Sequence, residues 1–320
     1  MRKQTAVLIA VVVLVSACKQ GQRSTVKKNE TTQDVSLANA DTALFRQVQQ
    51  QTFQYFWDGA EPLSGMGRER FHADNIYPDN DKHVVTSGGS GFGVMAILVG
   101  IERGFVTKEA GRQHLEKIVR FLETADRFHG AWPHWFNGET GKVVPFGKVD
   151  NGGDLVETSF MVQALLCVRQ YYQNGNAEEK TLAARADKLW KEVEFDWYRN
   201  GKNVLYWHWS PNVGWAMNHK IEGWNECLIT YIMASSSNTD SIPPVVYHSG
   251  YARNGSMVNN ANYYGYQLPL GPANGGPLFW SHYSFLGVNP SGLNDTYASY
   301  QVQVTNHTKI NNEYCKANPG

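Results

Sequence analysis

Three carboxylates stand close together at the start of an expected helix over residues 154–173. Asp150, Asp154 and Glu157 are spaced by four and three residues, which places them on one face if the helix is already wound there. Clustered carboxylates repel one another, so at least one should hold its proton more tightly, as a general acid near neutral pH must. The same spacing also fits a capping box, in which Asp154 and Glu157 only satisfy backbone N–H groups.

A fourth carboxylate, Glu226, stands alone in an aromatic and apolar stretch. It follows Trp224 and precedes Cys227 at the start of an expected helix over residues 223–235. Such neighbours desolvate a carboxyl and favour its neutral form. The alternative is an ordinary first-turn glutamate that accepts hydrogen bonds from backbone N–H groups, and spacing alone does not separate the two.

These two acidic sites together suit the cleavage of a glycosidic bond. That reaction needs one carboxyl to protonate the leaving oxygen and a second to act on water or on the sugar. We expect Glu226 to donate the proton and the cluster around Asp154 to handle the water. Inversion would require carboxyl groups about 6.5–9.5 Å apart, and retention about 5–5.5 Å.

Helices and connections alternate in a way that indicates how these side chains are positioned. Helical patterns cover residues 41–56, 91–103, 108–126, 154–173, 177–197, 223–235 and 241–253, with weaker ones over 279–287 and 295–316. Short connections at 104–107, 173–176 and 236–240 alternate with long ones at 59–90, 127–153, 198–222 and 254–278. This alternation predicts an all-α fold of antiparallel hairpins in a ring, with the long, site-bearing loops on one rim.

Tryptophan is concentrated on that expected rim. Seven of the ten tryptophans lie in or beside the long connections: Trp132, Trp135, Trp207, Trp209, Trp215, Trp224 and Trp280. Stacking on the C–H face of a sugar requires an exposed ring. We therefore predict that glucose rings bind to Trp132, Trp135, Trp209 and Trp224.

The first residues are typical of targeting information. A basic start is followed by an apolar run over residues 6–15 and by Ser16-Ala17-Cys18, which resembles a bacterial lipobox. We expect residues 1–18 to be a lipoprotein signal, Cys18 to carry lipid, 19–40 to be a flexible tether and 41–320 to be the catalytic domain. The alternative is a plain secretory signal. The lipoprotein interpretation predicts the bacterial cell envelope, periplasmic or at the outer membrane.

Charge and cysteine usage argue against several classes of partner. The formal net charge is zero, so nothing calls for nucleic acid. Beyond Cys18, the cysteines Cys167, Cys227 and Cys315 are odd in number and far apart, which gives no support to a disulfide framework or a metal cluster. We expect a monomer with no metal and no cofactor.

Several motifs in one order resemble the bacterial glycoamylase-like domain, glycoside hydrolase family 144, the endo-β-1,2-glucanase family. The resemblance covers roughly residues 42–320. Its motifs are FQYFW at 53–57, SGFG at 90–93, ERGF at 102–105, FHG at 128–130, HWF at 134–136, GWNE at 223–226 and LFWSHY at 278–283.

The resemblance implies an (α/α)6 toroid that cleaves β-1,2-glucan or sophorose-type substrates with inversion and without a metal. It matches the family's acidic cluster to Asp150, Asp154 and Glu157, and its separate essential glutamate to Glu226. His134, His282 and Tyr283 lie in its motifs and join the substrate-binding candidates.

The chain departs from the family pattern in two places. Family domains usually continue past the position of Asn318, and we count fewer helices than six hairpins need, so we expect a toroid truncated at its C-terminal end and only marginally stable. The lead-in over residues 151–153 is also looser than expected. Two alternatives to a β-1,2-glucanase stay open: another glucan hydrolase on this scaffold, of glucoamylase type, and a non-catalytic glycan-binding lipoprotein.

Overall fold

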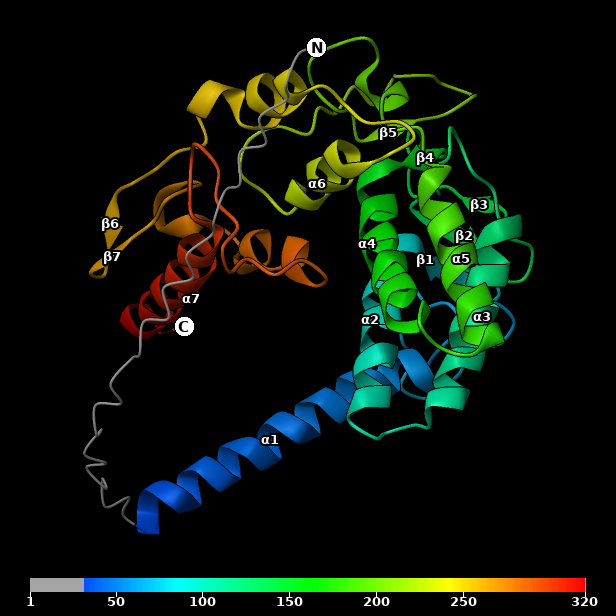
Figure 1. Ribbon diagram of the computed structural model, residues 1–320, viewed down its shortest axis with the longest axis horizontal. Helices are drawn as coiled ribbons and strands as arrows, with labels where there is room; N and C mark the ends of the chain where they lie inside the picture. Colours follow the sequence, from blue (N-terminus) through cyan, green and yellow to red (C-terminus); the bar gives the residue numbers. More distant parts are fainter. Residues whose placement is uncertain (1–31, 320) are drawn as a thin grey trace, which may run out of the picture. The chain divides into compact units, whose positions relative to one another are not determined.

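The computed structural model describes residues 32–319, with side chains from residue 41 (Figure 1). The predicted signal, Cys18 and the tether as far as residue 31 lie outside the described residues. The chain divides into two units, residues 1–46 and 47–320, and helix α1 (Thr32–Trp57) runs across the boundary. This helix begins earlier than the expected start at Asp41, because residues 32–40 contain neither glycine nor proline to end it.

Helices dominate the second unit, which confirms the prediction of a helix-rich fold. The described helices are α2 (Ser87–Glu102), α3 (Lys108–Thr124), α4 (Leu155–Tyr172), α5 (Ala177–Lys191), α6 (Leu228–Ser236) and α7 (Tyr300–Ala317). None of the helices in the described part of the chain is long and apolar enough to cross a membrane.

Three more of the expected helices differ from the structure, in type or in where they begin. The helix expected over 223–235 begins only at Leu228, because Asn225 accepts a hydrogen bond from the backbone of Cys227 and is itself bound by Tyr251. The helix expected over 241–253 is a π-helical turn, Val246–Tyr251, which follows two prolines without N–H groups. The helix expected over 279–287 is a pair of 3₁₀ turns, Leu278–Ser281 and Tyr283–Phe285.

Short strands brace the long connections. β1 (Val84–Thr86), β2 (Trp135–Asn137) and β3 (Val143–Val144) form an antiparallel three-stranded sheet. β4 (Gly153–Asp154) pairs with β5 (His208–Trp209), and β6 (Asn262–Tyr263) pairs with β7 (Tyr266–Gln267). The β4–β5 pair matters most here, because it joins two of the long loops directly before α4.

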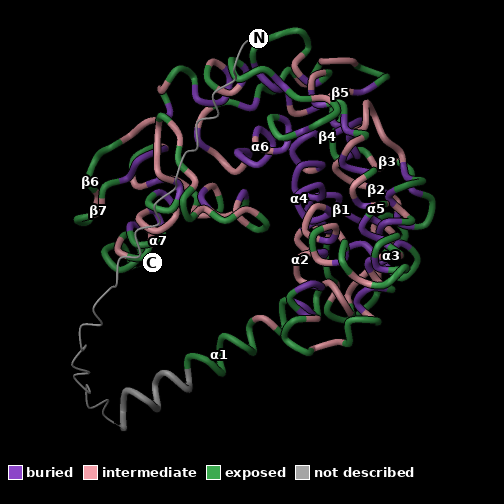
Figure 2. Tube along the Cα trace, viewed as in Figure 1, coloured by how far each residue is buried: buried purple, intermediate pink, exposed green. Residues whose placement is uncertain are grey.

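Helix α4 is the centre of the packing. It contacts α2, α5 and α6, while α3 packs against both α2 and α5 (Figure 1). Most of its residues are buried, whereas one side of α3 stays exposed (Figure 2). The N-terminal caps of the outer helices can be recognised in the sequence. Thr107 accepts a hydrogen bond from the backbone N–H of Ala110 at the start of α3, and Asn176 and Glu179 form a capping box at the start of α5.

The glycines of α2 allow it to approach α4 closely. A Cβ atom at Gly91 would lie 2.6 Å from the carbonyl oxygen of Phe160 and 2.8 Å from the backbone nitrogen of Met161. Both distances are shorter than real Cβ contacts, so only glycine fits there without a shift of backbone. This contact fixes the start of α2 beside the first turn of α4, where the carboxylate cluster lies.

Candidate active site

Asp154 is completely buried at the junction of β4 and α4. Its Oδ1 accepts a hydrogen bond from the backbone N–H of Glu157 at 2.9 Å, so it is the N-cap of the helix. Its Oδ2 accepts a second bond, also 2.9 Å, from the indole Nε1 of Trp207. The capping interpretation therefore holds for Asp154. The reciprocal half of a capping box is not formed, because the Glu157 side chain bonds elsewhere.

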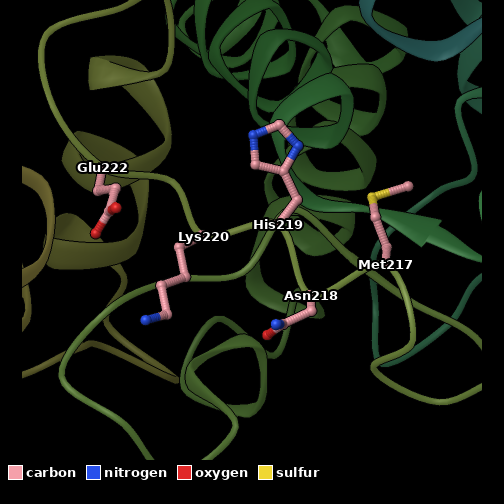
Figure 3. Close-up of a pocket in the computed structure, with 5 residues that line it drawn as sticks. All are labelled: Met217, Asn218, His219, Lys220 and Glu222. Carbon is pink, nitrogen blue, oxygen red and sulfur yellow. The ribbon is translucent and has the colours of Figure 1, made fainter.

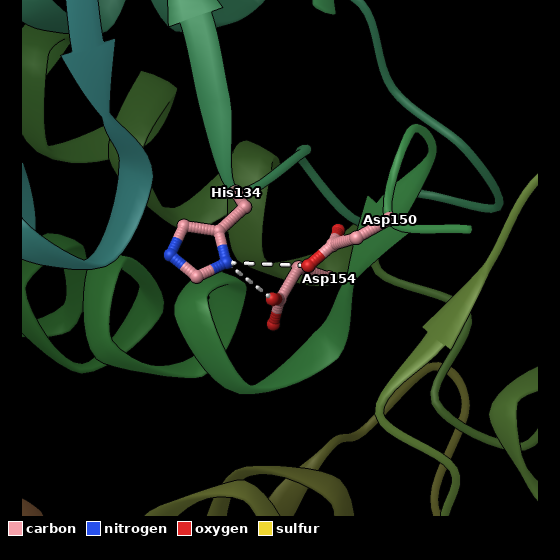
Figure 4. Close-up of side chains that lie close together, drawn as sticks. All are labelled: His134, Asp150 and Asp154. Atoms are coloured by element: carbon pink, nitrogen blue, oxygen red, sulfur yellow. Dashed lines mark ion pairs between the residues drawn. The ribbon is translucent and has the colours of Figure 1, made fainter. Parts of the chain in front are cut away.

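His134 faces Asp150 and Asp154 (Figure 4). Its Nδ1 lies 3.2 Å from Asp154 Oδ2 and 3.6 Å from Asp150 Oδ2. Burial of the ring opposes its positive charge, but the two aspartates outweigh burial and raise the pKa of His134 to about 10. At neutral pH the ring is therefore an imidazolium ion that offsets the negative charge of the cluster.

The same three side chains have the chemistry of a metal site. One ligand atom from each of His134, Asp150 and Asp154 can be chosen so that all lie within 4.8 Å of one another. A metal ion would, however, need the unprotonated imidazole nitrogen, and these carboxylates favour the protonated ring. The donor set thus suits a proton better than a metal, and the expectation of a metal-free site stays a prediction.

Glu157 projects from the first turn of α4 toward the start of α2. Its Oε2 accepts a hydrogen bond of 3.0 Å from the backbone N–H of Gly88, and the residue is only partly exposed. Burial, and next the charge of Asp154, raise the pKa of Glu157 to about 7, against the opposing charge of His134. The raised pKa of Glu157 agrees with the expectation that one carboxyl of the cluster holds its proton more tightly.

His208 fixes the segment that leads into the cluster. This buried ring accepts hydrogen bonds at Nε2 from the backbone N–H groups of Gly152, at 2.8 Å, and Asn151, at 3.2 Å. Burial lowers the pKa of His208, and a nitrogen that accepts twice carries no proton. Its 3.7 Å approach to Asp150 is therefore not an ion pair. Residues 151–153, which the sequence suggested to be loose, are held in place by this side chain.

Asp150 lies just before this anchored segment and is buried. Its Oδ1 has no hydrogen-bond partner among the described residues, whereas both oxygens of Asp154 are occupied. This oxygen is enclosed by protein, so a buried water can fill its free acceptor capacity. Within the cluster, Asp150 and Glu157 are therefore better placed to react than Asp154.

Glu226 precedes α6 and lies near the cluster in space. The adjacent thiol of Cys227 is fully buried, and its pKa is raised by burial, then by the charges of Glu226, Asp154 and Glu157. Both acidic sites therefore act on this one thiol, and α4 packs against α6. Ser284 Oγ donates to the carbonyl of Glu226 at 2.7 Å and holds that backbone in place.

The prediction that four tryptophans bind glucose rings is wrong for two of them. Trp132 is completely buried and donates its indole N–H to the carbonyl of Leu122, and Trp224 is buried against Tyr300. Neither ring can stack on a sugar, because neither has an exposed face. A residue of a long connection can pack into the core as a helical residue does. Trp135 and Trp209 remain partly exposed.

The other substrate-binding candidates lie at the surface or close to it. Tyr283 is exposed and meets Phe92 edge-on at 4.8 Å, and His282 is partly exposed with Nε2 3.0 Å from the Thr308 hydroxyl. Sequence reasoning missed His208 and Trp207 as site residues. The only sequence signal was the run Trp207-His208-Trp209, an unusual density of hydrogen-bonding rings.

Comparison with known proteins bears directly on this arrangement. The Glycoamylase family model, described as "Putative glucoamylase", matches residues 218–320. A solved endo-β-1,2-glucanase from Chitinophaga pinensis, in complex with sophorotriose and glucose, is 64% identical with a TM-score of 0.84. The alignment covers 87% of this chain and 68% of that one. This chain belongs to the glycoamylase-like family, glycoside hydrolase family 144.

Other members of the glycoamylase-like family differ in the action that their names describe. An exo β-1,2-glucooligosaccharide sophorohydrolase from Parabacteroides distasonis is 46% identical over 312 residues, which are 91% of this chain and 42% of that protein. A solved β-1,2-glucanase from the same species is 45% identical with a TM-score of 0.81, over 88% of this chain and 42% of that one. The present chain thus spans less than half the length of these two relatives.

Proposed function

We propose that this protein is a glycoside hydrolase that cleaves β-1,2-glucan or sophorose-type oligosaccharides with inversion. The observation that carries this proposal is that α4 packs against α6, while Glu226 and the cluster residues Asp154 and Glu157 all act on the Cys227 thiol. Two opposed carboxyl groups are what hydrolysis of a glycosidic bond requires. The family relatives named for action on β-1,2-glucans support the choice of linkage.

In this proposal Glu226 protonates the glycosidic oxygen and the cluster handles the water. The sequence favours Asp154 for that second role, but Asp154 is completely buried and its two oxygens already accept from Glu157 and Trp207. We assign the water to Asp150 instead, since its Oδ1 is free and the His134 imidazolium lies beside it. Asp154 then holds His134 and the helix start in position.

A second assignment of the proton donor is favoured by the pKa of Glu157. A carboxyl with a pKa of about 7 is half protonated at neutral pH, which suits a general acid. In that case Glu226 takes the water. The pH profile of turnover separates these two assignments of the proton donor. If Glu157 is the acid, turnover of the wild type falls above about pH 7. In Glu157→Gln this fall should be absent, while a low residual rate persists.

Two further expectations accompany this function. We infer that the hairpins belong to an (α/α)6 toroid with the site on the rim of long loops, as the family resemblance implies. Trp135, Trp209, His282 and Tyr283 remain the candidates to contact sugar, and the protein is expected to act as a monomer without metal. Unchanged turnover after treatment with a chelator would support the absence of a metal.

The direct test is incubation with linear β-1,2-glucan, starch and laminarin, with reducing ends and the anomeric configuration of the product measured over time. We expect new reducing ends from β-1,2-glucan alone and inverted product. Cleavage of starch instead would indicate a glucoamylase-type enzyme. Binding of β-1,2-glucan without new reducing ends, in the wild type as in Glu226→Gln, would indicate a glycan-binding protein.

A further inference from the structure

The side chain of Phe146 covers one face of the His134 ring. The two rings are almost parallel, with centroids 4.2 Å apart and planes at 11°. Phe146 also meets Trp135 edge-on, with centroids 4.8 Å apart. It lies in a run of exposed residues, 145–149, and is itself 52% exposed. An apolar ring that stays half exposed in such a loop thus has its contacts with the rings of residues 134 and 135.

Phe146 and Asp150 are held together by one tight hairpin. The backbone N–H of Phe146 donates to the carbonyl of Asp150 at 2.9 Å. Gly147 and Asp150 exchange two further backbone hydrogen bonds, of 3.2 and 3.3 Å. The residue assigned to handle the water and the ring that covers His134 therefore come from the same short segment of the chain.

Contact with the aspartates does not fix the plane of the His134 ring. The backbone is anchored, because the carbonyl of His134 accepts a hydrogen bond from the N–H of Ser87 at 3.1 Å. Within the described residues, however, Nδ1 has no hydrogen bond of good geometry, although Asp154 Oδ2 is only 3.2 Å away. Attraction between opposite charges depends on distance, whereas a hydrogen bond also depends on angle. The ring could therefore tilt and keep its ion pair.

The stack on Phe146 supplies the missing constraint. The His134 ring is an imidazolium ion at neutral pH, and a cation over the face of an aromatic ring is attracted by the quadrupole of that ring. The centroid separation of 4.2 Å is well within the range of this attraction. The stacked ring also keeps water from one face of the imidazolium, which strengthens its attraction to the two aspartates.

A second stack involves the other ring that contacts Asp154. The His219 ring lies on the indole of Trp207, with centroids 4.9 Å apart and planes at 24°, and this indole donates to Asp154 at 2.9 Å. His219 is exposed and points away from its neighbours Asn218 and Lys220 (Figure 3). Because a directional hydrogen bond already fixes the indole, the stacked ring of His219 adds little to its position. The two stacks therefore provide an internal comparison.

We propose that Phe146 is a positioning residue that holds the His134 ring in place against the carboxylates of Asp150 and Asp154. The inference rests on the proposed hydrolysis of β-1,2-glucans, in which Asp150 handles the water. Phe146 then acts on turnover through His134 and not through contact with sugar. An aromatic ring is required at this position, and an aliphatic side chain of similar size does not replace it.

Kinetics on linear β-1,2-glucan test the requirement for an aromatic ring. Phe146→Leu keeps an apolar side chain but removes the aromatic face, whereas Phe146→Tyr keeps that face. Loss of the cation–π contact predicts about tenfold lower kcat in Phe146→Leu, with KM within about twofold of the wild type. Phe146→Tyr should retain the wild-type kcat. So should two controls, Phe71→Leu at an exposed phenylalanine of another loop, and His219→Leu at the second stack.

A spectroscopic measurement tests the stack without relying on activity. Protons that lie over the face of an aromatic ring resonate at higher field, so the carbon-bound ring protons of His134 should do so in the wild type. They are observed at neutral pH in protein that contains isotope-labelled histidine, and they are assigned by their absence in His134→Gln. The shift to higher field should be lost in Phe146→Leu and kept in Phe146→Tyr and Phe71→Leu.

The outcomes separate this inference from the proposed function. If the wild type cleaves no glucan, the proton shift alone decides: its loss in Phe146→Leu supports the positioning role although hydrolysis fails. If the wild type cleaves β-1,2-glucan and Phe146→Leu turns over like Phe71→Leu, the positioning role is refuted and the function stands. A raised KM with unchanged kcat in Phe146→Leu would indicate contact with sugar and overturn the proposal. Absence of the shift in the wild type overturns it as well.

Discussion

Replacing Glu157 with glutamine should make the protein more stable at alkaline pH. The carboxyl has a pKa of about 7 in the folded protein against an ordinary 4.5, so the folded state binds its proton more tightly than the unfolded state does. Wild-type stability therefore falls as pH rises from 4.5 through 7. The difference between these values corresponds to about 3 kcal/mol once both states are ionised. Glutamine carries no charge and avoids this cost.

Thermal unfolding at a series of pH values measures this effect. The Tm of Glu157→Gln minus that of the wild type should be near zero at pH 4.5 and should reach about 6 °C at pH 8, at about 2 °C per kcal/mol for a chain of this size. Measurements stay below pH 8.5. His134 has a raised pKa of about 10, so below pH 8.5 it keeps its positive charge and does not contribute to the change in stability.

A matched control removes a carboxylate from an exposed ion pair. Glu313 lies on α7 with an oxygen 2.9 Å from Lys316 Nζ, and its change to glutamine should alter stability by less than about 0.5 kcal/mol at every pH. A Tm difference for Glu157→Gln that is the same at pH 5 and pH 8, or that favours the wild type at pH 8, would refute the assigned environment of Glu157.

The remaining predictions concern neighbouring contacts and the N-terminus. Gly88→Ala places a Cβ 2.1 Å from Glu157 Oε2 and should lower turnover at least tenfold with little change in Tm. Gly91→Ala instead places its Cβ against the backbone of α4 and should lower Tm by several degrees. Initial rates and thermal scans of both variants measure these effects. Trp207→Phe removes the N–H donor to Asp154 and should reduce kcat about tenfold while KM stays within twofold. Cys18→Ala should move the protein from the membrane fraction to the soluble fraction on cell fractionation, and unchanged membrane association would contradict lipidation.

Local sequence patterns predicted the outer helices well. α3 and α5 carry amphipathic patterns and caps within a few residues of their starts, so neighbouring residues determine where they begin. The helix α2 was expected only from Gly91, yet it begins at Ser87. Its first residues are small and glycine-rich and resemble a loop, and their helical form depends on the approach to α4 that no local pattern encodes.

The candidate site was predictable in its carboxylates and not in what surrounds them. One helical turn relates Asp154 to Glu157, so spacing alone grouped them. The roles of His208 and Trp207 depend on the pairing of β4 with β5, which joins loops distant in sequence. Exposure was also unpredictable: Trp132 lies in a long connection and is nevertheless completely buried, because that loop packs back onto α3.

The glycine content of α2 has a consequence for the order in which parts of the protein unfold. Five of its sixteen residues are glycine, and each costs about 1 kcal/mol relative to alanine in an isolated helix. This helix should therefore be stable only while docked, and it should unwind before α3 and α5 do. Unwinding would withdraw the Gly88 N–H from Glu157 and let water reach that carboxyl. We expect amide hydrogens of α2 to exchange faster than those of α5, and activity to decline on mild heating before the bulk helical signal does.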